Sequence, residues 1–295
     1  MVEIVRVGIV GGGLMGSGIA QVSALAGFDT VVREIDDRAT ERTRSAIERS
    51  LAKGVEKGKV DATDAQAAMG RLRVASDLEV LADRDLVLEA IVESLDAKQA
   101  LWRALDPMVG AGAIFATNTS SLSVAEQAAV TRRADRFVGL HFFNPVPVLR
   151  LVEVVRSVAT SEATLATATA WVRRLGKEPI VARDTPGFVV NLLLVPYMLD
   201  AIRAFEGGVA SIGDIDRGMQ LGAAMPSGPL ALCDTVGLDT LERVADVMHR
   251  ASGEPRHAPP ALLHRLVQGG KLGRKSGCGF YDYTTDPPTP TALAG

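Results

Sequence analysis

Short apolar runs alternate with amphipathic segments along the first part of the chain, up to residue 184. The runs at residues 5–10, 30–32, 86–90, 114–117 and 137–140 predict buried strands of the parallel type. Between them, residues 38–57 carry Ile47, Leu51 and Val55 at helical spacing, which predicts a long helix with one apolar face. Strands that alternate with helices in this way are typical of a doubly wound parallel sheet.

The pattern changes after Asp184. Helices are expected over residues 188–206, 212–221, 229–248 and 260–269, separated by turns rich in Gly and Pro. The sequence therefore predicts two domains, 1–184 and 185–283, the second all-helical. Residues 284–295 are rich in Pro and Thr and are expected to form a flexible tail.

Bulk composition excludes several classes of protein. Of the 295 residues, 47% are hydrophobic and 23% charged, and the net charge of −3 leaves no basic surface for nucleic acid. Only two cysteines occur, and together with the four histidines they form no metal-ligand pattern, so neither a disulfide framework nor a metal is expected. The longest apolar run, 188–199, is interrupted by Asn191 and Pro196, and no signal segment precedes the first strand. We expect a cytoplasmic protein with no membrane span.

The first strand runs into a glycine-rich turn. Gly11, Gly13 and Gly16 have the spacing of a dinucleotide-binding fingerprint, in which backbone and helix N-terminus approach a pyrophosphate. The second strand ends at Glu34, an acid suited to accept both hydrogen bonds from the adenine ribose and to repel the 2′-phosphate of NADP. Arg33 and Arg38 lie nearby and oppose that preference. The expected fold class is thus α/β, an N-terminal Rossmann-like doubly wound sheet with a C-terminal helical domain, and the expected cofactor is NAD.

A second candidate site lies near residue 141. His141 ends an apolar run, a turn bracketed by Pro145 and Pro147 follows, and the next apolar strand carries a single carboxylate, Glu153. Two strands joined by a turn bring an imidazole and a carboxylate together, and such a pair forms a general base. A buried histidine beside an unrelated glutamate is the alternative interpretation.

Six blocks, in order, give the chain a strong resemblance to the 3-hydroxyacyl-CoA dehydrogenase family, and most to its short single-function 3-hydroxybutyryl-CoA dehydrogenases. The blocks are GGGLMGSGIAQ, LVLEAIVESLDAK, ATNTSSL, GLHFFNPVPVLRLVEV, DTPGFVVNLLLVPY and GRKSGCGFY. The resemblance implies NAD-dependent, reversible oxidation of (S)-3-hydroxyacyl-CoA to 3-ketoacyl-CoA, with short-chain 3-hydroxybutyryl-CoA as the expected substrate. It also implies a homodimer formed through the helical domain.

The same resemblance assigns roles to single residues. His141 matches the catalytic base, Glu153 its orienting carboxylate, and Ser120 and Asn191 residues that bind the substrate oxygen and complete the site. Cofactor contacts are implied for Gly11, Gly13, Leu14, Met15, Gly16, Glu34, Glu93, Lys98, Asn118, Asn144 and Lys275. Ser50 and Lys57, on one side of the long helix, match positions that touch coenzyme A, and a solvated helix face is the competing interpretation.

Three alternatives stay open. The same chemistry could act on a carrier-protein-bound 3-hydroxyacyl group or on a sugar acid, or the chain could be a non-catalytic NAD-binding protein. The four matched catalytic positions argue together against a non-catalytic protein. The departures from the family pattern are Glu34 where aspartate is common, Ser227 where methionine is usual, and Cys278 at a variable position.

Overall fold

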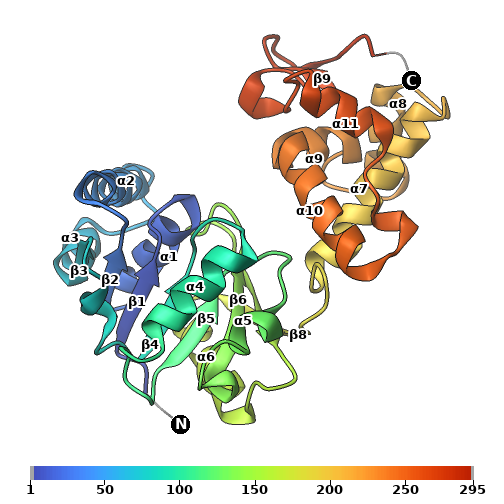
Figure 1. Ribbon diagram of the computed structural model, residues 1–295. Coiled ribbons are helices and arrows are strands. Elements are labelled where there is room, and N and C mark those ends of the chain that lie inside the picture. Colours follow the sequence, from blue (N-terminus) through green and yellow to red (C-terminus); the bar gives the residue numbers. More distant parts are fainter. Residues whose placement is uncertain (1–2, 294–295) are drawn as a thin grey trace. The chain divides into compact units, whose positions relative to one another are not determined.

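The computed structural model describes residues 3–293, and the chain divides into two compact units, Met1–Thr185 and Pro186–Gly295 (Figure 1). Each unit has its own hydrophobic core. The first contains an eight-stranded sheet and the second is built mainly of helices, so the predicted fold class is confirmed.

The sheet has the strand order β3-β2-β1-β4-β5-β6-β7-β8. Its strands are β1 (Arg6–Val10), β2 (Asp29–Arg33), β3 (Leu72–Ala75), β4 (Leu86–Glu89), β5 (Ile114–Thr117), β6 (Phe137–Phe142), β7 (Leu151–Arg156) and β8 (Glu178–Arg183). Strands β1 to β6 pair in parallel, β7 pairs antiparallel with β6, and β8 is parallel to β7. The chain reverses direction between β6 and β7, so the otherwise parallel sheet contains one antiparallel pair.

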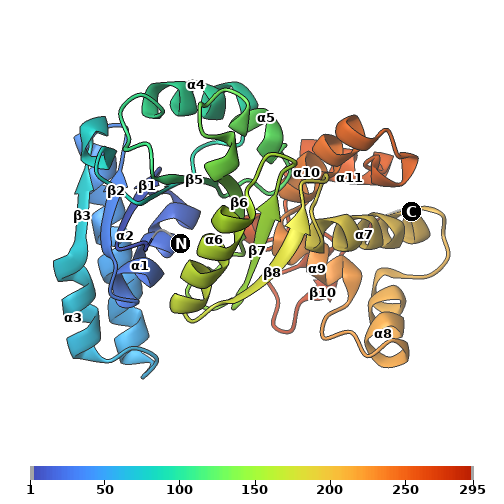
Figure 2. The same cartoon turned by 90° about the horizontal axis from the view of Figure 1, so that it is seen from below.

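Helices cover both faces of this sheet. They are α1 (Leu14–Leu25), α2 (Asp37–Glu56), α3 (Ala62–Arg71), α4 (Leu95–Leu105), α5 (Val124–Ala128) and α6 (Glu162–Arg174). Figure 2 shows α4 and α5 on one side of the sheet and α1 and α6 on the other. On the α4 side, Trp102 lies 4.9 Å from the rings of both Phe115 and Phe137, measured between ring centroids. Because helices cover both faces there, the central strands β4, β5 and β6 are buried at every position instead of at alternate ones.

Helix α3 and strand β3 are among the elements of this unit that were not predicted from the sequence. Helix α3 and strand β3 follow directly on one another, and β3 pairs in parallel with β2 at the edge of the sheet. Only Leu72 of this strand is buried, because an edge strand is covered on fewer sides. Its short, mixed sequence therefore lacked the continuous apolar run that marked the central strands.

Asp184, at the end of the first unit, caps the N-terminus of α5. Its carboxylate accepts hydrogen bonds from the backbone N–H groups of Val124 (2.9 Å) and Ala125 (2.7 Å), the first residues of α5. A carboxylate at a helix N-terminus satisfies free amides and interacts favourably with the helix dipole. The last residues of the unit are thereby tied back to the sheet.

The second unit consists of α7 (Val190–Glu206), α8 (Ile212–Gly222), α9 (Pro229–Val236), α10 (Leu238–Ser252) and α11 (Ala261–Gln268), with a two-stranded sheet of β9 (Tyr281–Asp282) and β10 (Thr289–Pro290). The prediction of a single helix over 229–248 is wrong. The helix is interrupted at Gly237, whose φ of +96° is incompatible with an α-helix and favours glycine.

The chain end also differs from expectation. Residues 284–293, expected to be a flexible tail, include β10, and the backbone N–H of Thr291 donates to the Phe280 carbonyl. Leu293 packs against the core of the unit. These tertiary contacts order a segment whose composition alone suggested disorder. Residues 294 and 295, also assigned to that tail, lie outside the described residues.

Candidate active site

The glycine-rich turn connects β1 to α1. Gly11 has φ +89°, and a Cβ at Gly16 would overlap the carbonyl oxygen of Gly11, so both positions require glycine. Gly13 is the N-cap of α1, where no side chain caps the helix, and a Cβ at Gly13 would meet no atom within 4 Å. Leu14 and Met15 begin α1, with Leu14 exposed. The N-terminus of α1 thus has no side-chain cap and has open space at Gly13, as an anion site requires.

Glu34 follows β2 and bends over this turn. Its Oε1 accepts hydrogen bonds from the Gly12 backbone N–H at 2.9 Å and the Thr43 hydroxyl at 2.7 Å. Neighbouring Arg33 donates through Nε to the Ser76 carbonyl at 3.1 Å. The acid is therefore aimed at the glycine turn, while the Arg33 guanidinium is engaged with another strand end.

His141 and Glu153 are paired residues of the antiparallel β6–β7 ladder. The His141 Nδ1 lies 2.6 Å from the Glu153 Oε2, and both side chains are buried, with exposed fractions of 7% and 0%. The ring of Phe143 stands 4.4 Å from the imidazole ring, centroid to centroid. Since the carboxylate faces Nδ1, the neutral ring carries its proton there and leaves Nε2 as the basic atom.

A buried ionic network lies at the carboxyl ends of β4 and β5. Lys98 Nζ is 2.6 Å from Glu89 Oε1 and 3.0 Å from Glu93 Oε2, with Lys98 and Glu89 almost fully buried. The second oxygen of Glu89 accepts from the Thr117 hydroxyl at 2.7 Å. A lysine can be buried here because two carboxylates share its charge.

Through Glu93, this network reaches the segment that carries Ser120. The Glu93 Oε1 accepts hydrogen bonds from the Thr119 hydroxyl and from the Ser120 backbone N–H, the latter at 3.1 Å. Burial alone would raise the pKa of Glu93, but the Lys98 charge and these donors outweigh it and lower the pKa below its ordinary value. Glu93 is therefore an anion that fixes the loop after β5.

Two asparagines flank the His141 strand. Asn118, directly after β5, accepts the Phe142 backbone N–H on its Oδ1 at 3.0 Å and so ties β5 to the end of β6. Asn144 is exposed at the start of the proline turn, joined by a cis peptide bond to Pro145. Lys177 braces that turn by donating to the carbonyls of Val146 (2.5 Å) and Leu149 (2.7 Å).

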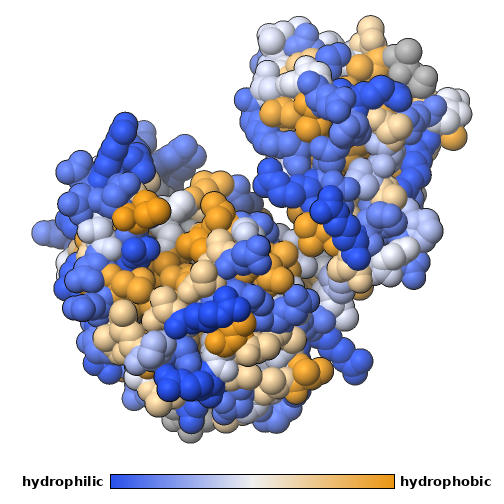
Figure 3. All heavy atoms as spheres, viewed as in Figure 1, coloured by the Kyte–Doolittle hydropathy of each residue, from blue (hydrophilic) through white to orange (hydrophobic). Residues whose placement is uncertain are grey.

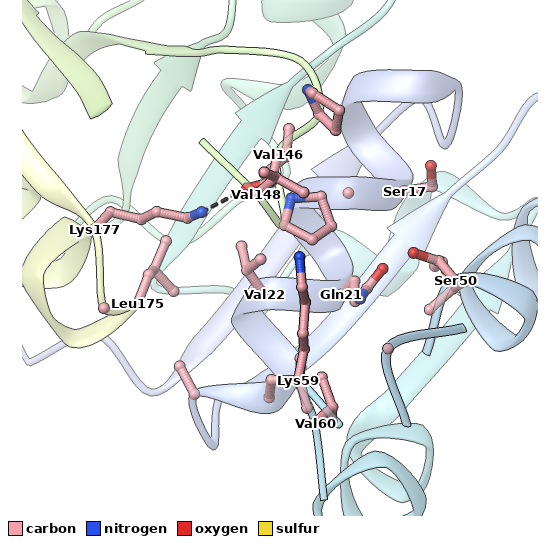
Figure 4. A pocket seen from close by; sticks show the side chains of 18 of the residues that line it. Ser17, Gln21, Val22, Ser50, Lys59, Val60, Val146, Val148, Leu175 and Lys177 are labelled. Atoms are coloured by element: carbon pink, nitrogen blue, oxygen red, sulfur yellow. Dashed lines mark hydrogen bonds between the residues drawn. The ribbon is translucent and has the colours of Figure 1, made fainter. Parts of the chain in front are cut away.

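Ser50 and Lys57 line a pocket of about 810 Å³ between α1, α2 and the proline turn (Figure 4). In Figure 4, Lys59 extends into the pocket while Ser50 and Lys177 stand on opposite sides of it. Val22 and Val146 contribute to an apolar floor. The pocket thus combines apolar walls with ammonium groups, which suits a ligand that has both a flat apolar part and phosphates.

The other predicted site residues belong to the second unit. Asn191 is the second residue of α7. Lys275 forms an ion pair with Asp239, with Nζ 2.6 Å from Oδ2. The Ser227 hydroxyl donates to the Gly228 carbonyl, immediately before α9.

Sequence reasoning missed Glu89 and Thr43. A charged residue inside an apolar strand was the available signal for Glu89, since fully buried carboxylates are rare unless paired. Thr43 carried no such signal, because its contacts with Gly12 and Glu34 depend on how α2 packs.

Two features are absent from residues 3–293, the part of the chain that the structure describes. In that range no helix is long and apolar enough to cross a bilayer. Nor do His, Cys, Asp and Glu residues there gather into groups of three or more suited to hold a metal ion.

Comparison with known proteins gives the same family for both units. Residues 6–185 match the family model "3-hydroxyacyl-CoA dehydrogenase, NAD binding domain", and residues 187–283 match the C-terminal domain of that family. A 3-hydroxybutyryl-CoA dehydrogenase of Mycobacterium tuberculosis is 47% identical over 95% of this chain and 99% of its own length. The human mitochondrial hydroxyacyl-coenzyme A dehydrogenase is 44% identical over 94% of this chain and 91% of its own.

Solved structures agree. The crystal structure of (S)-3-hydroxybutyryl-CoA dehydrogenase from Ralstonia eutropha superposes with a TM-score of 0.92 at 42% identity, covering 96% of this chain and 100% of that one. FadB2 of M. tuberculosis gives 0.93 at 47% identity, with the same coverage. The chain therefore belongs to the 3-hydroxyacyl-CoA dehydrogenase family.

Proposed function

We propose that this protein is an NAD-dependent dehydrogenase that reversibly oxidises (S)-3-hydroxyacyl-CoA, with 3-hydroxybutyryl-CoA as its substrate. The observation that carries the proposal is the buried His141–Glu153 pair, in the same unit as an uncapped glycine-rich turn. A protein that only bound a dinucleotide would gain nothing from a buried base. The family to which the chain belongs supports the same conclusion.

The cofactor site fits NAD. Gly13 leaves room for a pyrophosphate where a side chain would intrude, and Glu34 places a carboxylate beside the turn, where an adenine ribose would bind. Leu14, Met15, Glu93, Lys98, Asn118, Asn144 and Lys275 stay in the proposed contact set on the family resemblance. When bound, NAD supplies the group that accepts the hydride from C3 of the substrate.

His141 acts as the base in this proposal. Its Nε2 takes the proton of the 3-hydroxyl while Nδ1 keeps its hydrogen bond to Glu153. The imidazolium that forms is stabilised by the Glu153 carboxylate, whose full burial strengthens the interaction. Ser120 and Asn191 are proposed to hydrogen-bond the substrate oxygen, and the bonds from Glu93 set the position of the Ser120 backbone.

The coenzyme A handle is proposed to lie in the pocket beside α2. Ser50 and Lys57 line it, and Lys53 and Lys59 add further positive charge. These ammonium groups favour a phosphorylated handle and disfavour a free sugar acid as substrate. A carrier-protein substrate would lack the adenosine phosphates, and so would make less use of this pocket.

The test is NADH formation with purified protein, NAD and a panel of C4 to C16 (S)-3-hydroxyacyl-CoA substrates. We expect turnover with the C4 substrate and faster reaction with the CoA ester than with the matching acyl-pantetheine. Absence of NADH formation with every CoA ester, in protein that binds NADH, would refute the proposal. Equal rates with acyl-pantetheine would favour a carrier-bound substrate.

We further propose a cytoplasmic homodimer formed through the second unit. Leu193 on α7 and Leu221 on α8 are 69% and 74% exposed, and Figure 3 shows hydrophobic atoms on the visible face of this unit. Exposed apolar side chains that form a contiguous patch mark an interaction surface, and we propose that these two leucines belong to one. A monomer in light scattering at micromolar concentration would refute the dimer. For the location, the free thiols Cys233 and Cys278 fit a reducing compartment.

A further inference from the structure

We propose that Thr43 is a specificity-determining residue of the cofactor site, which acts by holding the Glu34 carboxylate in place against the glycine-rich turn. The inference rests on the proposed function, in which NAD binds at that turn. Thr43 lies outside the glycine fingerprint, on α2.

Three groups form a closed set of contacts. The Thr43 Oγ1 lies 2.7 Å from Glu34 Oε1 and 3.1 Å from the Gly12 carbonyl oxygen, and the Gly12 backbone N–H donates to the same Glu34 oxygen at 2.9 Å. Thr43 is only 4% exposed, so water does not compete for its hydroxyl. A hydrogen bond to a charged acceptor in such a setting is stronger than one between neutral groups.

The need for glycine at position 12 is independent support. Gly12 is not one of the three fingerprint glycines, yet a Cβ there would overlap Cγ2 and Oγ1 of Thr43 and come within 2.8 Å of Glu34 Oε1. The middle glycine is therefore required by the packing of Thr43 and Glu34 on the turn. Its φ is not in the left-handed region, so backbone strain does not explain it.

The two oxygens of the Glu34 carboxylate have different hydrogen-bond partners. Oε1 already accepts two hydrogen bonds, while Oε2 has one long contact, to the Ile35 backbone N–H at 3.3 Å. Oε2 is thus the oxygen available to the ribose hydroxyls. A carboxylate fixed in advance binds ribose at a lower entropic cost. It also keeps a negative charge where the 2′-phosphate of NADP would lie.

The test compares Thr43→Val, which removes the hydroxyl and keeps the shape, with Thr43→Ser, which keeps the hydroxyl. Thr40→Val is the matched control, because Thr40 lies one turn earlier on α2 and its hydroxyl donates to the Asp36 carbonyl. For each protein, the Kd for NADH is measured by fluorescence titration, and kcat and KM are measured with NAD and with NADP.

We expect Thr43→Val to raise the Kd for NADH roughly tenfold, as for loss of a hydrogen bond to a charged group. Thr43→Val should raise the KM for NAD and leave kcat at saturating NAD unchanged, and the preference for NAD over NADP should fall several-fold. Thr43→Ser should keep most of the wild-type affinity for NADH and most of the preference for NAD. Thr40→Val should match the wild type.

Two results would overturn the inference. One is a Thr43→Val protein with wild-type Kd and cofactor preference, and the other is a Thr43→Ser protein as impaired as Thr43→Val. If Thr43→Val does not fold, Thr43→Ala replaces it, and Glu34→Ala is compared with Glu34→Ala/Thr43→Ala: equal Kd values for NADH in these two proteins support action through Glu34, and a further loss in the double variant contradicts it. A wild-type protein that binds no NADH would instead refute the proposed function.

Discussion

Glu153 lies directly opposite His141 in the β6–β7 ladder, with one carboxylate oxygen 2.6 Å from the imidazole Nδ1. Residues opposite one another in an antiparallel pair point to the same face of the sheet, so the register alone brings these side chains together. The exposed fraction of the Glu153 side chain is 0%, and its charge is not screened by solvent. The base and its orienting group are thus set by backbone pairing, which makes their geometry rigid.

Replacing Glu153 by Gln should lower kcat by about 10²-fold or more, because an amide no longer stabilises the imidazolium and can orient the wrong tautomer. Steady-state kinetics checks this, with the Kd for NADH expected to stay near its wild-type value. Glu178→Gln is a suitable control, since Glu178 is an exposed residue of the neighbouring strand β8, paired with Arg150. A Glu153→Gln enzyme as active as this control would contradict the dyad.

Glu93 should make the stability of the first unit depend on pH in the acid range. Its pKa is lower in the folded state than the ordinary value of 4.5, so the folded state binds fewer protons than the unfolded state. The stabilisation is therefore complete above the ordinary pKa and is lost as the pH falls through the lowered one.

Glu93→Gln should accordingly lower the free energy of unfolding by about 1–2 kcal/mol at pH 7, and by less as the pH falls below about 5. Urea unfolding at pH 7, 5 and 4 measures the difference. Glu56→Gln, at the exposed end of α2, serves as the control. A difference that stays constant or grows on acidification would show that the charge of Glu93 is not its source.

Glu89 should be among the most sensitive positions for stability. Glu89→Gln leaves Lys98 buried with one carboxylate instead of two, and we expect a loss of about 2–4 kcal/mol in the free energy of unfolding. Adding Lys98→Met removes the buried charge and should restore part of that loss. Denaturant unfolding of both single variants and the double variant tests the coupling. Strictly additive losses would contradict it.

Lys57→Ala should raise the KM for acyl-CoA about three- to tenfold, because one phosphate contact in the pocket is lost. The rate with acyl-pantetheine and the Kd for NADH should not change. Arg49→Ala is the matched control, since Arg49 is an exposed cation on the same helix that does not line the pocket. An equal effect of both substitutions would point to general electrostatic attraction and away from a binding site at Lys57.

The strands of the first unit could be predicted because each central strand is an uninterrupted apolar run bounded by turn residues. The pairing of His141 with Glu153 was also expected, since a proline turn joins two strands and leaves few possible registers. Edge elements were harder. Strand β3 is largely uncovered and has a mixed sequence, and the break at Gly237 shows only as one glycine in an otherwise helical pattern.

Contacts between distant elements account for what the sequence did not reveal. The ionic contacts of Lys98 with Glu89 and Glu93 were not expected from the sequence, because they depend on how α4 packs across two strand ends. Thr43 meets Glu34 only because α2 returns over the glycine turn. The order in residues 284–293 likewise depends on contacts with Phe280 and its neighbours, which local composition does not encode.

The most direct measurement compares wild-type and His141→Gln protein for NADH formation from (S)-3-hydroxybutyryl-CoA, with the Kd for NADH determined on the same samples. The account predicts that the substitution lowers the rate by about 10²–10⁴-fold, as for loss of a general base, while the Kd changes less than about threefold. A His141→Gln protein that turns over within a few-fold of the wild type would contradict the central role given to the His141–Glu153 pair.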